Sequence, residues 1–193
     1  ESKLAGEDQT RISLEAIERE TLRCQSTMKN LLDFARRTPP DTQPVDMNEL
    51  LEAAWRTVDD DLPVHSIETQ RGFDPHLPLI QVDRKQMEQA LVQLIRNACD
   101  AIHLGGTLRL ITRSVGSEVQ IIVADTGPGL SPEQLRHIFD PFYVMNEQGQ
   151  KAGMGLSIAH GVIERHGGTI EVESQEGKGT TFTIHLSLES EPQ

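Results

Sequence analysis

The chain has 193 residues, of which 36% are hydrophobic, enough for one full domain with a core and one further element. Its formal net charge of -12 argues against general nucleic-acid binding, because phosphate backbones require a basic surface. The two cysteines, Cys24 and Cys99, both fall in apolar helical patterns, which is typical of buried thiols in a reducing compartment. No apolar run reaches the length of a membrane span, and no signal peptide is visible. We therefore expect a cytoplasmic chain, and an anchor to the inner membrane would have to belong to parts of a longer protein outside it.

The first predicted element is one long helix over residues 7–37. Neither Gly nor Pro interrupts this range, and a seam of small and apolar residues recurs in steps of four and three: Thr10, Leu14, Ile17, Thr21, Cys24, Met28, Leu31 and Ala35. Such a seam has to pack against another helix, in this chain or in a partner. The sequence Thr38-Pro39-Pro40-Asp41 ends the helix, and the following residues, up to about 45, read as a linker.

A globular domain is predicted from residue 46 to 188, followed by a short tail over 189–193. Apolar periodicity and turn residues predict helices over 46–58, 83–103, 131–138 and 155–165, and strands over 64–69, 79–82, 108–114, 118–125, 169–174 and 180–188. This mixture is typical of helices packed on one face of a mixed, mostly antiparallel sheet.

Two amides lie on the longest helix of this domain. Gln93 and Asn97 are four residues apart and share a helix face. An amide oxygen held on a rigid helix is a hard ligand that suits Mg²⁺. An ordinary surface amide is the commoner explanation of any single Asn, so this pair alone leaves the question open.

A second polar segment, Asp125-Thr126-Gly127-Pro128-Gly129, ends a predicted strand. A carboxylate at a strand end can accept a hydrogen bond from an exocyclic amine such as that of adenine. Glycine lets the backbone approach a flat ring closely. Taken alone, the segment is better explained as an Asp-initiated turn.

Two further glycine-rich segments follow. Gly153-Met154-Gly155-Leu156-Ser157 opens a helix, whose free N–H groups and dipole suit a phosphate. Residues 144–152, just before it, have no period and read as a mobile loop where a lid would lie. Gly177-Lys178-Gly179-Thr180-Thr181 precedes the last strand, and a tight hairpin turn is its simplest interpretation.

The order of these segments is far more specific than any one of them. The chain contains, in this order, an Asn-bearing helix, Asp-x-Gly-x-Gly, Phe139-Asp140-Pro141-Phe142, Gly-x-Gly and Gly-x-Gly-Thr. This series resembles the Asn, Phe and Gly boxes of sensor histidine kinases, within the superfamily shared with gyrase, heat-shock chaperone and mismatch-repair ATPases. The resemblance covers residues 45–188, and the strings at 155–159 and 164–170 fit the kinase branch closely.

The segment Leu31-Leu32-Asp33-Phe34-Ala35-Arg36 resembles the end of the second helix of the kinase dimerisation and phosphoacceptor domain. Residues 1–38 are therefore expected to be a partial dimerisation region, followed by a linker over 39–45 and the ATP-binding catalytic domain over 46–188. None of the seven His residues has the context of a phosphoacceptor. The helix that carries the acceptor is thus expected to be missing from this chain.

The resemblance implies an α+β fold, a two-layer α/β sandwich of the Bergerat ATP-binding type with a long N-terminal helix. It implies a protein histidine kinase that transfers the γ-phosphoryl group of MgATP to a histidine on the missing helix, and thence to an aspartate in the receiver domain of a response regulator. The full-length protein is expected to be a homodimer. Asn97 should hold Mg²⁺ and act in catalysis with Gln93. The expected nucleotide-binding residues are Asp125, Gly127, Gly129, Lys151, Gly153, Met154, Gly155, Leu156, Thr180 and Arg96.

The sequence departs from the family pattern at two places. Gln93 stands where the kinase branch usually has Asn and the ATPase branches have a general-base Glu. An amide cannot activate water, which favours phosphoryl transfer over hydrolysis. Val144-Met145-Asn146 stands where a Thr-Thr-Lys is frequent, so Lys151 or Arg96 is expected to replace the phosphate-contacting Lys. Two alternatives stay open: a degenerate nucleotide-binding or dimerisation module that signals without kinase activity, and an ATPase of the wider superfamily.

Overall fold

The computed structural model describes residues 39–61, 67–102, 105–141, 143 and 154–188, together with Thr21. The chain divides into two units, Glu1–Thr38 and Pro39–Gln193, and the second contains the whole of the fold described below. The long helix predicted over residues 7–37 lies outside the described residues except for Thr21, which is helical.

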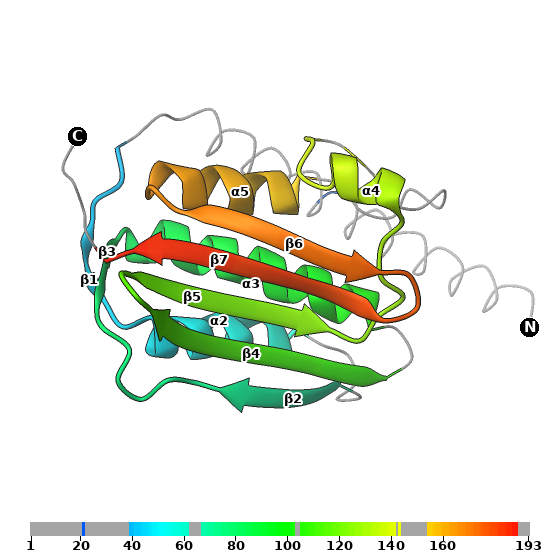
Figure 1. Ribbon diagram of the computed structural model, residues 1–193, viewed down its shortest axis with the longest axis horizontal. Helices are drawn as coiled ribbons and strands as arrows, with labels where there is room; N and C mark the ends of the chain where they lie inside the picture. Colours follow the sequence, from blue (N-terminus) through cyan, green and yellow to red (C-terminus); the bar gives the residue numbers. More distant parts are fainter. Residues whose placement is uncertain are drawn as a thin grey trace, which may run out of the picture. The chain divides into compact units, whose positions relative to one another are not determined.

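A five-stranded sheet forms one layer of the second unit (Figure 1). Its strands lie in the order β2 (Ile67–Gly72), β4 (Gly106–Val115), β5 (Glu118–Asp125), β7 (Gly179–Ser187) and β6 (Thr169–Gln175). β2 and β4 are parallel, and the other neighbouring pairs are antiparallel. The mixed, mostly antiparallel sheet that the sequence predicts is thereby confirmed.

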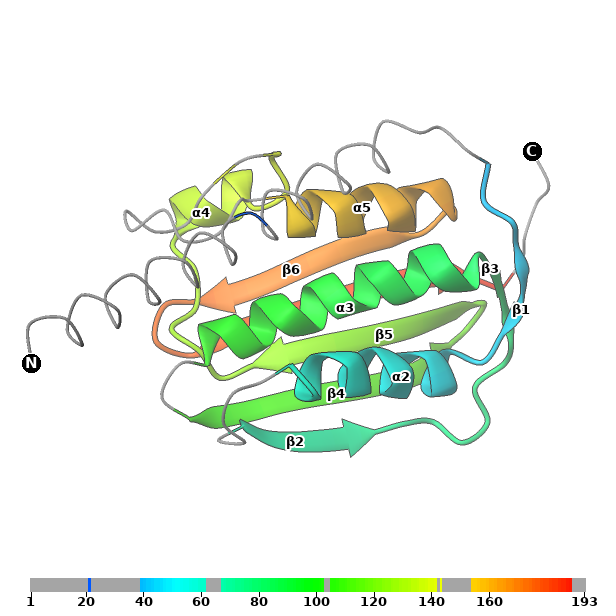
Figure 2. The ribbon, with the colours of Figure 1, turned by 180° about the vertical axis from the view of Figure 1, so that it is seen from behind.

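The helices form the second layer. α2 (Met47–Asp59), α3 (Arg84–Ala101) and α5 (Gly155–Arg165) lie on one face of the sheet, with α3 between the other two (Figure 2). A short α4 (Pro132–His137) follows β5. Between the layers lies a core of aliphatic side chains around Phe182, as the low aromatic content requires. The predicted two-layer α/β sandwich is confirmed.

Two aspartates determine where the first long helices begin. The Asp46 side chain accepts hydrogen bonds from the backbone N–H groups of Asn48 and Glu49, at 2.8 and 3.3 Å, and so caps α2. Asp83 caps α3 in the same way through Lys85 and Gln86. Each cap satisfies N–H groups that a helix leaves unpaired at its start. The predicted helices over 46–58 and 83–103 therefore begin within one residue of the observed ones.

The structure differs from the predicted strands at two places. β1 (Gln43–Val45), which the sequence did not predict, pairs with β3 (Ile80–Val82) within the range that reads as a linker. The strand predicted over 64–69 is observed as β2, from Ile67 to Gly72, and residues 62–66 lie outside the described part. β2 is an edge strand with mostly exposed side chains, so it lacks the apolar alternation that marks a half-buried strand.

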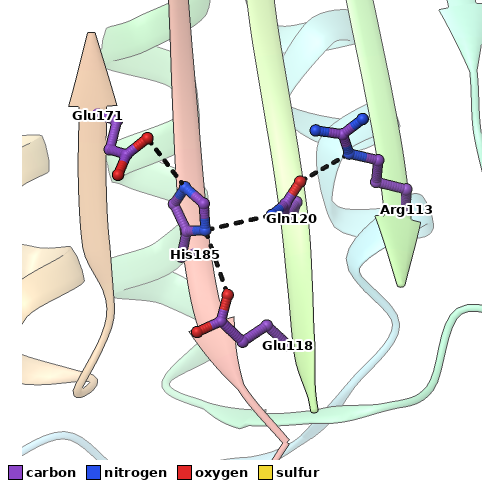
Figure 3. Close-up of polar contacts among 5 residues, drawn as sticks. All are labelled: Arg113, Glu118, Gln120, Glu171 and His185. Carbon is purple, nitrogen blue, oxygen red and sulfur yellow. Dashed lines mark hydrogen bonds and ion pairs between the residues drawn. The ribbon is translucent and has the colours of Figure 1, made fainter. Parts of the chain in front are cut away.

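The sheet face opposite the helices carries a row of polar side chains across four strands (Figure 3). Arg113 Nε donates to Gln120 Oε1 at 2.6 Å, and the Gln120 amide lies 3.4 Å from His185 Nδ1. The two ring nitrogens of His185 lie 3.3 Å from Glu118 and 3.6 Å from Glu171. Among the described residues, this face is linked by cross-strand polar contacts rather than by burial under a helix.

A buried hydroxyl ties α2 to the sheet and to the segment after β2. Thr112, only 2% exposed, donates to Asn48 Oδ1 at 2.6 Å and accepts from the backbone N–H of Asp74 at 3.1 Å. Asn48 in turn donates to the Asp74 carbonyl at 2.8 Å. The three residues come from α2, β4 and the segment after β2, so this network fixes α2 on its end of the sheet.

We predict that Thr112→Val lowers the free energy of unfolding by about 2 kcal/mol, because it leaves the Asn48 oxygen and the Asp74 N–H unpaired in a buried place. Thr112→Ser keeps the hydroxyl and serves as the control, with a smaller loss of about 1 kcal/mol from the missing methyl group. Urea unfolding of both variants measures the difference. If the Val variant were as stable as the wild type, the network would make no net contribution.

Candidate functional site

The Asp125 carboxylate is buried at the end of β5, where the residue is 4% exposed. Its Oδ1 atom accepts hydrogen bonds from the backbone N–H groups of Gly127, at 2.8 Å, and Thr180, at 3.3 Å. Its Oδ2 atom is buried and has no hydrogen-bond partner among the described residues. Buried polar atoms are nearly always paired, so this oxygen marks a place for a donor from a ligand.

Burial raises the pKa of the Asp125 carboxyl above its ordinary value of 3.8, and this outweighs the two backbone hydrogen bonds, which lower it. The low-dielectric surroundings penalise the charged form, and two donors on one oxygen only partly offset that penalty. A third donor, directed at Oδ2, would stabilise the carboxylate. A ligand that supplied such a donor would relieve this electrostatic cost.

Close approaches hold two loops and the end of α3 together around this carboxylate. A side chain at Gly179, whose φ is +103°, would collide with the backbone oxygen of Asp125, and one at Gly129 would collide with the carbonyl of Gln175. A β-carbon at Gly127 would lie 2.9 Å from the Ala101 side chain at the end of α3. Glycine is required where backbones meet this closely. The second and fourth sequence segments are thus brought together at the C-terminal end of α3.

Ser174 joins the same loops, although no sequence motif marks it. Its hydroxyl donates to the Gly179 carbonyl at 2.9 Å, accepts from the Leu130 N–H at 2.9 Å, and lies 3.0 Å from Thr180 Oγ1. The Thr180 hydroxyl is therefore engaged by Ser174, while the Thr180 backbone contacts Asp125. Ser174 follows Ile170 and Val172 on the inward face of β6. A polar residue at this otherwise apolar position is the only sequence signal for its role.

The first turn of α5 lies against α3. A β-carbon at Gly155 would lie 2.6 Å from Gln93 Oε1, so the two residues are in direct proximity. The N-cap residue Met154 provides no side-chain cap, and the first turn contains no acidic residue. Met154 and Leu156 are buried and Gly155 is half-buried. The unpaired N–H groups and the positive end of the helix dipole at this position favour an anion.

One side of α3 connects these two places. Gln93, Asn97 and Ala101 follow one another at intervals of four residues, so they succeed each other along the helix. Gln93 touches Gly155 of α5, and Ala101 touches Gly127 of the loop beside Asp125. Asn97 lies between them, half-buried, with no side-chain hydrogen bond to another described residue. From Gln93 to Ala101 the helix rises about 12 Å, which separates the first turn of α5 from the loop beside Asp125.

One other predicted residue, Arg96, stands apart from this arrangement. Arg96 is exposed, and its Nη2 lies 2.6 Å from Asp61 Oδ2, after the end of α2. Since α2 and α5 flank α3 on opposite sides (Figure 2), this ion pair lies on the side away from Gly155. Lys151 and Gly153 lie outside the described residues, so their roles stay predictions.

We predict that the buried Asp125 carboxyl makes the free energy of unfolding of the unliganded chain depend on pH. Since the folded state raises the pKa of Asp125 above 3.8, it holds the proton more tightly than the unfolded state. The free energy of unfolding therefore falls as pH rises from about 3.8 through the raised pKa, and the loss persists at higher pH. Asp125→Asn cannot ionise and lacks this loss.

The stability of Asp125→Asn relative to the wild type should thus increase with pH over this window. Urea unfolding at a series of pH values measures it. A difference between the two chains that stays constant or decreases with pH would contradict this account.

Comparison with known proteins finds a family and several relatives that match this chain. Residues 82–190 match the family described as histidine kinase-, DNA gyrase B-, and HSP90-like ATPase. The sensor histidine kinase ZraS of Escherichia coli (strain K12) is 35% identical over 170 residues, covering 88% of this chain and 36% of ZraS.

Among solved structures, full-length ShkA in complex with AMPPNP superposes with a TM-score of 0.79 at 26% identity, covering 91% of this chain and 38% of ShkA. Histidine kinase ThkA in complex with the response regulator protein TrrA superposes with a TM-score of 0.75 at 23% identity, covering 90% of this chain and 49% of ThkA, which supports the fold.

The chain spans about a third of the length of the ZraS relatives that it matches. Within the described residues, no helix is both long and apolar enough to cross a bilayer. The family match covers the helix with Gln93 and Asn97, the Asp125 loop and the α5 entry, and it confirms the resemblance predicted from the order of the sequence segments. The chain therefore belongs to the histidine kinase-, DNA gyrase B-, and HSP90-like ATPase family, with sensor histidine kinases among its relatives.

Proposed function

We propose that this chain is the ATP-binding catalytic region of a sensor histidine kinase, which transfers the γ-phosphoryl group of MgATP to a histidine outside the chain. The observation that carries the proposal is the buried Oδ2 of Asp125, which has no hydrogen-bond partner in the described part of the chain. The exocyclic amine of adenine is a neutral donor that would complete the hydrogen bonds of this carboxylate. The loop glycines Gly127 and Gly129 leave backbone, rather than side chains, beside such a ring, with Thr180 at its edge.

The other end of the site fits the phosphates. The first turn of α5, with Met154, Gly155 and Leu156, offers N–H groups and the positive end of a dipole. Asn97, between this turn and the Asp125 loop, would hold Mg²⁺ through its amide oxygen, with Gln93 beside it. Gly153, Lys151 and Arg96 are further candidates for phosphate contacts. Arg96 would first have to leave Asp61.

Catalysis in such a site consists mainly of holding ATP in the right position for the attacking imidazole. Mg²⁺, when bound with the nucleotide, neutralises phosphate charge, and the chain's own residues orient the two ends of ATP. Gln93 supplies an amide where hydrolysis would need a carboxylate base, so water at this position is not activated. This residue type favours transfer to an incoming imidazole over release of phosphate.

The relatives suggest how the whole protein works. ZraS, DctS and CckA are named sensor kinases, and the ThkA structure contains a response regulator protein. We infer that the phosphoryl group passes from the kinase histidine to an aspartate in the receiver domain of a response regulator. The full-length protein would be a homodimer, and this region would lie in the cytoplasm whether or not other parts anchor it to a membrane.

We predict that Asp125→Asn weakens binding of MgATP by roughly ten- to a hundredfold, because it replaces a charge-assisted hydrogen bond to the adenine amine. Titration calorimetry with the chain measures the dissociation constants. Asp41→Asn is the matched control, because Asp41 is exposed near the N-cap of α3, at the other end of that helix, and should bind normally. Equal affinity of the Asp125 variant and the wild type would remove Asp125 from the site.

We predict that Asn97→Ala reduces phosphoryl transfer by about a hundredfold or more in the full-length protein, because a ligand for the metal is lost. Acid-labile radiolabel from ATP measures the transfer, while nucleotide binding without Mg²⁺ should persist. The 193-residue chain alone should acquire no such label. Nucleotide binding by the full-length protein without any transfer would favour the degenerate signalling module, and steady phosphate release without an acceptor would favour an ATPase.

A further inference from the structure

His166 connects the C-terminal end of α5 to the start of α3. It is the C-cap residue of α5 and is half-buried. Its Nδ1 lies 2.8 Å from the Val162 carbonyl, one turn back in the same helix. Its Nε2 lies 3.0 Å from the backbone N–H of Asp83, the N-cap residue of α3.

These two contacts use both ring nitrogens. A carbonyl can only accept, so Nδ1 is the donor to Val162, and a backbone N–H can only donate, so Nε2 is the acceptor from Asp83. His166 therefore joins α5 to α3 through one donated and one accepted hydrogen bond. Nearby, Arg165 reaches Gln86 Oε1 at 3.5 Å, which is a longer and exposed contact.

The position of this link matters because α3 and α5 are antiparallel (Figure 2). At one end His166 meets Asp83, and at the other Gly155 meets Gln93. From Gly155 to His166 the helix rises about 16 Å, and from Asp83 to Gln93 about 15 Å, so the two contacts have matching separations. Two contacts at matching separations fix how far α5 can slide along α3.

We propose that His166 is a positioning residue, which sets the register of α5 against α3 and thereby places the first turn of α5 beside Gln93 and Asn97. This rests on the proposed function, in which that turn binds the phosphates of ATP. Asp125 belongs to β5 and is held by Gly127 and Thr180, so the adenine end does not depend on this register. His166 thus controls the phosphate end of the site and leaves the adenine end unchanged.

The test compares two ligands on the 193-residue chain. AMPPNP with Mg²⁺ uses both ends of the site, whereas adenosine uses only the adenine end. His166→Leu removes both hydrogen bonds, and His166→Asn keeps a donor near the Nδ1 position but does not reach Asp83. His166→Gln places an amide oxygen near the Nε2 position and can accept from the Asp83 N–H. His185→Leu, on the opposite face of the sheet, is the matched control (Figure 3).

We expect His166→Leu and His166→Asn to weaken AMPPNP binding by about five- to tenfold, the effect of one hydrogen bond, with little change for adenosine. His166→Gln should restore most of the AMPPNP affinity, and His185→Leu should bind both ligands normally. In amide NMR spectra of the unliganded Leu and Asn variants, the resonances of Gly155 and Leu156 should shift, while those of Asp125 and Gly127 should not.

Three results would overturn the inference. Equal loss for both ligands would mean that His166 supports the whole fold rather than one end of the site. Unchanged AMPPNP affinity in the Leu and Asn variants, with unchanged Gly155 resonances, would mean that α5 is positioned without it. A wild-type chain that bound neither ligand would instead contradict the proposed function, and with it the role of His166.

Discussion

The site depends on one buried carboxylate, that of Asp125, whose hydrogen-bonding capacity the described residues satisfy only in part. Asp125 receives two backbone hydrogen bonds on Oδ1 and none from the described residues on Oδ2. The resulting rise in its pKa is a measure of the free energy that the fold gives up to keep this carboxylate buried. In the proposed function, a ligand that donates a hydrogen bond to Oδ2 would recover part of that free energy, which would favour a ring that carries an amine.

The surrounding backbone is arranged to keep this charge in place without filling the space beside it. Gly179 and Gly129 allow the β6–β7 turn and the loop after β5 to meet at distances that no side chain would permit. Ser174 then links the two loops through three polar contacts. The carboxylate is consequently held by two backbone N–H groups, from Gly127 in the adjoining loop and from Thr180 at the start of β7, rather than by side chains.

The helix α3 acts as the common support for both ends of the site. Its side with Gln93, Asn97 and Ala101 contacts α5 at one end and the Asp125 loop at the other. At its N-terminus the backbone N–H of Asp83 contacts His166 at the C-terminal end of α5, ten residues before Gln93. A nucleotide has two chemically different ends, and a rigid helix of fixed rise is a suitable element for keeping their binding groups at a fixed separation.

The sequence by itself determined the features that rest on local physics. The helix starts at Asp46 and Asp83 follow from capping, the two hairpins follow from alternation and turn residues, and the ordered polar segments indicate the family. Only the tertiary structure decided which polar atoms stay unpaired or find distant partners. Four features leave no local pattern in the sequence. They are the Oδ2 of Asp125 that has no partner among the described residues, the link of His166 to a residue 83 positions earlier, the pairing of β1 with β3, and the ion pair of Arg96 with Asp61. Their physical cause is packing: each depends on where remote segments come to lie, and periodicity and capping act only over a few neighbouring residues.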